Sequence, residues 1–256
     1  MSVFDHYRPN ERAFIEQVLD WVQQVEDNYM LKVTDFLDPR EQQIVRQLVG
    51  KQLAIYEDGG FVGAERRRLI LAPDYYELDP NDFEIAIRQI DYPTKFVELT
   101  HRQVTGTLLN AGLKRQKFGD VVLDDGIAQF ATTRDAAGFI EMNVDRVGKA
   151  RIRISEVAPE AVLVVPEVKW SDEFGIVSSL RFDTVVSEVL GLSRQKAQAL
   201  VKHGDCKVNH KPIDDPSFIL EPDDLVSIRG YGRVKLTAIL GSTKREKIKI
   251  QYGIIR

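Results

Sequence analysis

Apolar residues follow a helical period near the start of the chain. They recur three or four positions apart from Phe14 to Val25, which predicts an amphipathic helix. Further on, Asp38 supplies a capping carboxylate, Pro39 suits the first helical position, and Glu41 can reach back to the cap. A second helix is therefore expected to begin there.

Two short apolar runs follow these helices. Residues 53–56 and 69–72 are rich in apolar side chains and flank a glycine-containing loop, which predicts two short strands joined as a hairpin. The basic run Arg66-Arg67-Arg68 is expected to form a solvated strand edge. Residues 1–75 are thus predicted to form a small helical and hairpin unit.

The middle of the chain gives signals in the order strand, helix, strand, strand, helix, strand. This is the order of ferredoxin-like and RNA-recognition folds, so residues 76–165 are predicted to form such a domain. The central hairpin turns at Asp124-Asp125-Gly126, where glycine tolerates a positive φ. The expected strands are 83–90 with an extension at 96–99, then 121–123, 127–131 and 152–154, and the expected helices are 104–113 and 136–147.

The polar segment 166–180 is expected to be a linker, and residues 181–256 are expected to form the last domain. Apolar positions in 185–190 predict a short helix that Gly191 ends, and Ser193 caps a second helix. Arg194, Gln198 and Lys202 recur every four residues along that second helix. They therefore form one stripe of hydrogen-bond donors.

Alternating residues after the helix pair predict short strands with basic outward positions. Lys207 alternates with Val208, and Arg229 follows a similar alternation. We expect these side chains to converge on one solvent-facing side. The whole chain is therefore predicted to have an α+β fold of three parts.

Charge divides the chain more clearly than composition does. The net charge is −4, but the residues from Arg181 onward hold 14 Lys and Arg against 9 Asp and Glu, which gives +5, and the preceding residues carry −9. A basic module attached to an acidic body favours binding to a phosphate backbone. The longest apolar run is too short to cross a membrane. The single cysteine, Cys206, can form no internal disulfide, so we expect a cytoplasmic protein. A single cysteine also excludes a metal site built from several thiolates.

The terminal domain resembles the RNA-binding domain shared by ribosomal small-subunit protein four, several pseudouridine synthases and tyrosyl-tRNA synthetases. Three positions depart from that pattern, namely Phe182, His210 and Asp223, of which the last two replace glycine at turns. The matching residues are Arg181, Asp183, Ser193, Arg194, Ala197, Leu200, Gly204, Val208, Asn209, Asp224 and Val226. The resemblance implies that Arg181, Arg194 and Lys202 bind RNA, and Gln198, Lys207, Lys211 and Arg229 are further candidates for RNA contact.

Upstream, the chain resembles the YlmH family of bacterial ribosome-associated proteins. The stretches that carry this are TDFLDPREQ at 34–42, GGFVGAERRR at 59–68, APDYY at 72–76 and FVELTHRQVTGTLLNAGLKRQKFGD at 96–120. The resemblance implies binding to ribosomal RNA and tRNA on a large ribosomal subunit that carries peptidyl-tRNA, in quality control of stalled chains. Members of the family are also encoded near cell-division genes.

The middle domain offers a second set of candidates for RNA contact. His101 and Arg102 precede its first helix, and Lys114, Arg115 and Lys117 follow that helix. Its sheet is not expected to stack bases, because residues 127–131 lack the aromatic pair of RNA-recognition domains. Phe130 is expected in the core.

No catalytic motif is found in a fitting context, so a non-catalytic protein without metal or cofactor is predicted. Gly230-Tyr231-Gly232 lacks the third glycine and the helix of a dinucleotide site, and the four histidines lack metal-ligand spacing. Arg181-Phe182-Asp183-Thr184 resembles the catalytic motif of pseudouridine synthases, but it opens the binding module, so we expect Asp183 to cap a helix. The alternatives are an RNA-modifying enzyme targeted by the terminal domain and a cell-division adaptor that uses the acidic part.

Overall fold

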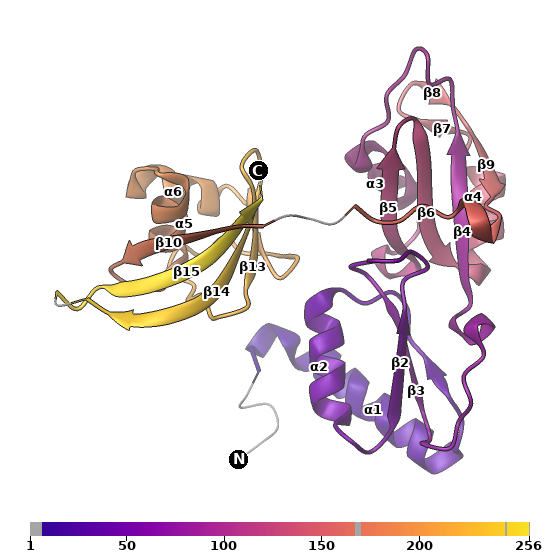
Figure 1. The fold of residues 1–256 in the computed structure, drawn as a ribbon, viewed down its shortest axis with the longest axis horizontal. Coiled ribbons are helices and arrows are strands. Elements are labelled where there is room, and N and C mark those ends of the chain that lie inside the picture. Colours follow the sequence, from indigo (N-terminus) through magenta and orange to yellow (C-terminus); the bar gives the residue numbers. More distant parts are fainter. Residues whose placement is uncertain (1–6, 167–169, 244, 256) are drawn as a thin grey trace. The chain divides into compact units, whose positions relative to one another are not determined.

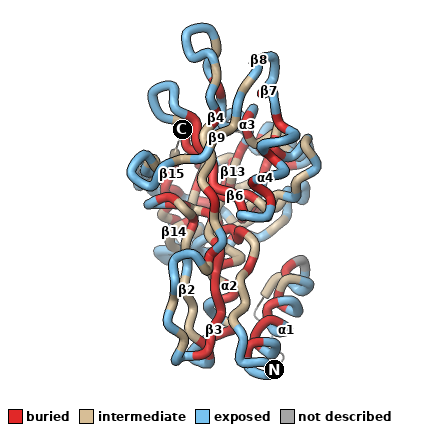
Figure 2. Tube along the Cα trace, turned by 90° about the vertical axis from the view of Figure 1, so that its right-hand side faces the viewer, coloured by how far each residue is buried: buried red, intermediate tan, exposed pale blue. Residues whose placement is uncertain are grey.

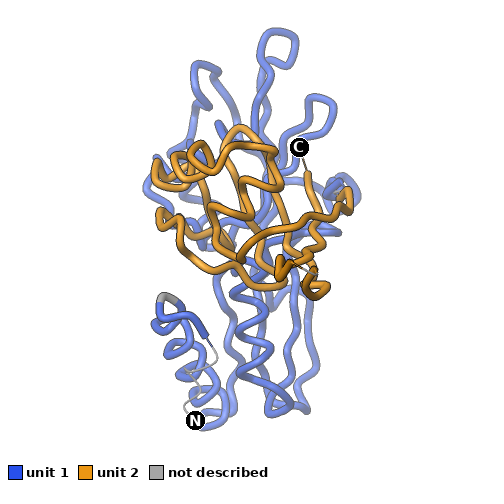
Figure 3. The backbone as a smooth tube through the Cα atoms, turned by 90° about the vertical axis from the view of Figure 1, so that its left-hand side faces the viewer, with its two compact units in different colours: residues 1–166 blue, residues 167–256 orange. Residues whose placement is uncertain are grey.

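The computed structural model describes residues 7–166, 170–243 and 245–255. The chain divides into two compact units, Met1–Pro166 and Glu167–Arg256 (Figure 3), and each is described by itself. Within the described residues, no helix is both long and apolar enough to cross a membrane.

Two helices and a three-stranded sheet build the first part of unit 1 (Figure 1). Helix α1 spans Arg12–Asn28 and α2 spans Pro39–Val49. The predicted capping box is confirmed, because the Asp38 carboxylate accepts from the Glu41 N–H at 2.9 Å and the Glu41 carboxylate accepts from the Asp38 N–H at 2.8 Å. Both predicted helices are therefore correct.

The predicted hairpin is present and gains a third strand. Strands β2 (Ala54–Asp58) and β3 (Arg68–Ala72) pair antiparallel, and the short β1 (Lys32–Val33) lies on the other side of β3. All five residues of β3 are buried (Figure 2), because the two helices pack on one of its faces and the middle part of the unit packs on the other. The central strand thus joins two cores.

The basic run beside β3 is mostly buried, which corrects the expectation of a solvated edge. Arg66 and Arg68 are 8% and 5% exposed. The guanidinium of Arg66 donates to the Phe36 carbonyl at 2.6 Å, and that of Arg68 donates to the carbonyls of Thr34 at 2.7 Å and Phe83 at 2.6 Å. These arginines satisfy buried backbone carbonyls that no strand partner reaches.

The middle part has the predicted ferredoxin-like order. Its antiparallel sheet runs β5-β6-β4-β9, with both α3 and α4 packed on one face, so the expected arrangement of six elements is confirmed. The elements are β4 (Ile85–Asp91), α3 (His101–Asn110), β5 (Phe118–Asp124), β6 (Ile127–Thr133), α4 (Arg134–Asn143) and β9 (Arg153–Glu156). Phe130 is fully buried, as expected. The described residues of unit 1 also form 3-10 turns at Pro9–Glu11, Pro80–Phe83, Arg115–Lys117 and Pro159–Ala161.

Two details of this part differ from the prediction. Residues 96–99 form no strand, because β4 ends before Pro93 and the chain turns there, which leaves Phe96 86% exposed. The second helix ends at Asn143 rather than 147, since Val144 is already extended. Val147 instead belongs to a small hairpin of β7 (Arg146–Val147) and β8 (Ala150–Arg151).

The second face of the middle sheet is covered from within unit 1. Phe36 and Phe61 pack on Val122 and Ala131 of the sheet, and the segment after Pro159 adds Val162, Leu163 and Val165 to the same cluster. Gly119 permits a close approach, because a Cβ there would lie 2.7 Å from the Phe36 ring. The face on which RNA-recognition domains stack bases is therefore closed in this unit.

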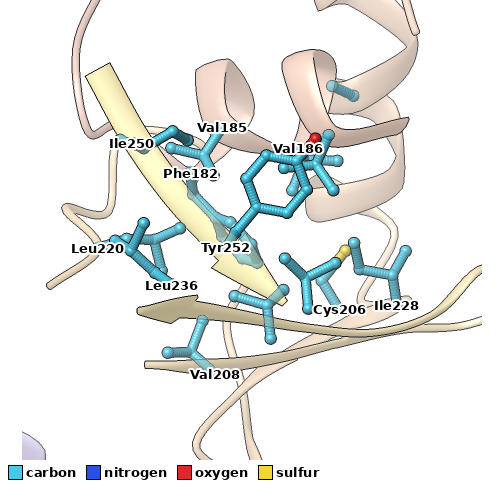
Figure 4. Packing of buried hydrophobic residues seen from close by; sticks show 14 of the residues in the cluster. Phe182, Val185, Val186, Cys206, Val208, Leu220, Ile228, Leu236, Ile250 and Tyr252 are labelled. Atoms are coloured by element: carbon cyan, nitrogen blue, oxygen red, sulfur yellow. The ribbon is translucent and has the colours of Figure 1, made fainter. Parts of the chain in front are cut away.

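Unit 2 packs two helices on one face of a six-stranded antiparallel sheet of order β10-β15-β14-β13-β11-β12. Figure 4 shows Val185 and Val186 of the first helix beside Ile250 and Tyr252 of the sheet. The elements are β10 (Ser171–Val177), α5 (Phe182–Leu190), α6 (Arg194–Lys202), β11 (Cys206–Val208), β12 (Lys211–Pro212), β13 (Leu225–Ile228), β14 (Gly232–Ser242) and β15 (Ile248–Ile255).

The predicted linker 166–180 is wrong over most of its described length. Residues 171–177 form the edge strand β10, which pairs with β15 along its whole length. Alternate residues of β10 face solvent, so the segment reads as polar although Gly175 and Val177 are buried. Residues 167–169 of the expected linker lie outside the described residues.

A buried side-chain pair connects the two turns that lack glycine. The Asn209 amide donates to Asp224 at 2.8 Å and accepts from the Leu225 N–H at 2.9 Å. His210 and Asp223, which replace glycine beside these residues, have φ of 67° and 71°. The turns therefore keep the left-handed geometry that glycine favours, and side-chain hydrogen bonds hold it.

The closed face of unit 1 gives a stability prediction. Phe36→Ala should lower the free energy of unfolding by about 3–5 kcal/mol, because it removes a fully buried ring and leaves a cavity. Urea denaturation of the full chain measures this. The control Phe96→Ala, at an exposed position, should change stability by at most about 0.5 kcal/mol. Equal midpoints for both variants would contradict the described packing.

Candidate RNA-binding surface

The helix pair of unit 2 brings the starts of its two helices together. Gly191 ends α5 with a φ of 62°, and the Ser193 hydroxyl caps α6 by accepting from the Lys196 N–H. Val186 and Val201 are buried in the common core, so both helices are fixed against the sheet. Both boundaries agree with the sequence prediction. The polar residues at the two helix starts are thereby placed side by side.

A single buried carboxylate organises these polar residues. Asp183 is completely buried and accepts from Arg181 Nε at 3.1 Å, Arg194 Nε at 3.2 Å and Gln198 Nε2 at 2.7 Å. The expectation that Asp183 caps a helix is wrong, because Arg181 occupies the cap position and the Asp183 side chain turns toward α6. Its role is to hold the donors of two helices on one carboxylate.

Electrostatics favour the charged form of this carboxylate. Burial alone raises the pKa of Asp183, but the hydrogen bonds from Arg181, Gln198 and Arg194 outweigh it and hold the pKa well below its usual range. The same contact raises the pKa of Arg181. The Asp183 carboxylate and the Arg181 guanidinium are therefore charged at neutral pH.

The two arginines keep donors available to a ligand. The Arg181 side chain is 34% exposed and that of Arg194 is 55% exposed. Asp183 takes Nε of each and one terminal nitrogen of Arg181, so Arg194 bonds it through Nε alone. A guanidinium held in place by its inner nitrogen presents its outer nitrogens in a fixed fork, which suits a phosphate.

The other predicted residues of unit 2 do not join the Asp183 centre, although Lys207 and Arg229 are both exposed, as expected. Lys202 is exposed at the end of α6. Lys207 pairs with Ser227 on the sheet face opposite to the helices, whereas Lys211 is half-buried in the edge strand opposite Val208. Arg229 follows β13 and lies 3.4 Å from the Asp205 carboxylate.

Sequence reasoning missed two further basic residues on the outer sheet face. Arg233 lies opposite Ser227, so it shares a cross-strand row with Lys207, and Lys235 follows on the same side of β14. The signal was available, since both alternate with the buried Val234 and Leu236. Lys235 pairs with Asp223 at 3.1 Å.

The candidates in the middle of unit 1 divide into interior and exposed groups. Arg115 donates to the Phe118 carbonyl at 2.5 Å and lies over the Phe118 ring, and burial lowers its pKa to about 10. Lys117 bridges Asp35 at 3.1 Å and Asp135 at 3.2 Å. Lys114, His101 and Arg102 are exposed. Contacts within the fold therefore occupy Arg115 and Lys117.

Metal chemistry finds no support in the described part of the chain, where no group of three or more His, Cys, Asp or Glu side chains could hold an ion. Cys206 is buried in the core of unit 2, and burial raises its pKa to about 11. A thiol with so high a pKa is a poor nucleophile.

Three family models together match about three quarters of the chain. They are the N-terminal part of YlmH over residues 10–76, a putative RNA-binding domain in YlmH over 79–161 and the S4 domain over 180–226. Ribosome-associated protein quality control protein P2 of Bacillus subtilis (strain 168) is 41% identical over 252 residues, which is 98% of each chain. The chain belongs to the YlmH family. Both resemblances read from the sequence are thereby confirmed.

Two further relatives match parts of this YlmH-family chain. The solved structure of cell division protein ylmH from Streptococcus pneumoniae matches with a TM-score of 0.54 and 29% identity, and it covers 63% of this chain and 100% of its own. Small ribosomal subunit protein uS4 of Thermoanaerobacter sp. (strain X514) is 43% identical over 54 residues, 21% of this chain and 26% of its own. The S4 match includes Asp183, Arg194 and Asn209 but ends before β14 and β15.

The Asp183 centre predicts a pH-dependent loss of stability. Asp183→Asn should lower the free energy of unfolding by about 2 kcal/mol at pH 7, because an amide cannot accept from all three donors. The pKa of this carboxylate is depressed in the folded state, so its contribution is present above about pH 4 and is lost as pH falls further.

Thermal and urea unfolding at pH 7 and pH 3 test this. The difference between the parent and Asp183→Asn should narrow at pH 3, while the exposed control Asp214→Asn should match the parent at both values. A difference that is independent of pH would contradict the charged centre.

Proposed function

We propose that the protein is a non-catalytic RNA-binding protein that docks on the ribosome. The observation that carries this is the Asp183 centre, where one buried carboxylate orients Arg181 and Arg194 and leaves their outer donors exposed. Two oriented arginines match the phosphates of structured RNA, which A-form helices present at their surface. The S4 domain that contains this centre is shared with a ribosomal protein.

The docking site that we infer is ribosomal RNA and tRNA on a large subunit carrying peptidyl-tRNA, in translation quality control. Support comes from the relative that is 41% identical over the whole chain, whose name describes it as a ribosome-associated quality control protein. The basic charge of residues 181–256 accords with a phosphate-rich partner. Ribosome association corresponds to a cytoplasmic location.

An RNA-modifying activity is the less favoured alternative. The motif Arg181-Phe182-Asp183-Thr184 supplies an aspartate, but its carboxylate is fully buried and accepts three side-chain donors besides the Thr184 hydroxyl at 3.3 Å. A carboxylate so occupied cannot approach a base. We therefore assign Asp183 a positioning role.

The arginines should dominate ribosome binding. Arg181→Ala and Arg194→Ala should each weaken binding to large subunits by about tenfold, because each removes a charge-assisted phosphate contact. Cosedimentation with large subunits that carry peptidyl-tRNA measures this. Lys196→Ala is the matched control, since Lys196 is an exposed cation on the opposite side of the same helix and should bind as the parent does.

Arg194→Lys separates charge from geometry. It should recover only part of the lost affinity, because an ammonium cannot reproduce a guanidinium fork. Parental cosedimentation by both alanine variants, with unchanged melting temperatures, would show that the binding surface lies elsewhere.

The intact protein should make no change to RNA. After incubation with ribosomes or tRNA, mass spectrometry of the digested nucleotides should match the protein-free sample. A modified nucleotide formed in at least stoichiometric amount, and absent with Asp183→Asn, would establish the enzyme alternative instead.

A further inference from the structure

The small hairpin of unit 1 carries exposed basic side chains. Arg146 and Arg151 lie directly opposite one another across β7 and β8, and Lys149 is at the turn. All three are exposed, and none forms an ion pair with any other residue that the structure describes. We call these three residues the hairpin patch.

The hairpin is held firmly by its other face. Val147 and Ala150, which pair across the two strands, are 2% and 7% exposed, and Val147 belongs to the core under α3 and α4. Gly148 has a φ of 59°, which allows the tight two-residue turn. The backbone at Asp145 also accepts from the Ile152 N–H at 2.9 Å. The hairpin patch is thus displayed on an ordered element.

This arrangement opposes the stability of the free protein. Like charges directly opposite one another on paired strands repel, and Asp145 is the one acidic residue in the stretch 144–155, which holds four cations. An anionic ligand would turn this repulsion into attraction. The two arginines suit a phosphate ligand, because a guanidinium fork binds two phosphate oxygens at once, whereas a lysine ammonium acts as a point charge.

The start of α3 lies beside the hairpin. Strand β7 packs against α3, and the Gln103 side chain lies beside Gly148 of the turn. Arg102, adjacent to Gln103 in sequence, is exposed and likewise forms no ion pair with a described residue. The middle sheet face is covered, but this end of the domain carries exposed basic side chains.

We propose that the hairpin patch is a second RNA-binding site, which contacts the phosphate backbone of ribosomal RNA independently of the Asp183 centre. This inference rests on the proposed function. It gives the middle domain a contact of its own, through the hairpin rather than through the sheet. Because the two units belong to one chain, a contact by the first raises the effective concentration of the second at the same RNA.

The test uses the full chain with Arg146→Gln and Arg151→Gln combined. The matched control is Lys51→Gln with Arg134→Gln, two exposed cations of the same unit outside the hairpin. Binding to large ribosomal subunits, and to RNA extracted from them, is measured across a salt series. The hairpin variant should bind both about tenfold more weakly, and the slope of log affinity against log salt should fall by about two.

The outcomes separate this inference from the proposed function. If the hairpin variant binds like the control while Arg194→Ala binds weakly, the second site is refuted and the Asp183 centre stands. If the hairpin variant loses affinity for subunits but not for extracted RNA, its partner is an acidic ribosomal protein and the inference is overturned. If the parent itself binds neither probe, the proposed function fails first.

Discussion

The buried carboxylate of Asp183 is the constraint on which the functional surface depends. Taking a charge out of water is costly unless hydrogen bonds and opposite charges compensate, and here two arginines and a glutamine do so. The same contacts fix the arginines at the point where two helix starts meet. A residue that stabilises the fold thereby orients the groups that we assign to RNA, so stability and binding share one interaction.

Unit 1 resembles RNA-recognition domains in fold but does not expose the same surface. Its ferredoxin-like sheet has the strand order of RNA-recognition domains, yet Phe36, Phe61 and the segment after Pro159 cover the face that those domains use. The fold alone therefore does not indicate the binding mode. The hairpin patch remains exposed at another part of the domain. The proposed RNA contacts of both units are thus arginine-rich edges rather than aromatic platforms.

Local signals predicted local structure well. The capping box at Asp38, the turn at Gly126 and the helix stop at Gly191 each depend on residues a few positions apart, and all three are present. The errors in the predicted structure arose where contacts between segments far apart in the sequence determine the structure. Strand β10 pairs with residues about eighty positions later, and Arg68 is buried by carbonyls from two other segments. Motif comparison identified Arg181 and Arg194 as candidates for RNA contact. Only the packing of α5 on α6 shows that Asp183 binds both of them.

Crosslinking of the full-length protein to RNA in living cells tests the central claim most directly. The crosslinked peptides are mapped by mass spectrometry and the attached RNA is sequenced. The account predicts crosslinks within residues 181–202, which contain the Asp183 centre, to ribosomal RNA or tRNA of the large subunit. Crosslinks that avoid this segment altogether, or that join it to RNA unrelated to the ribosome, would contradict the account.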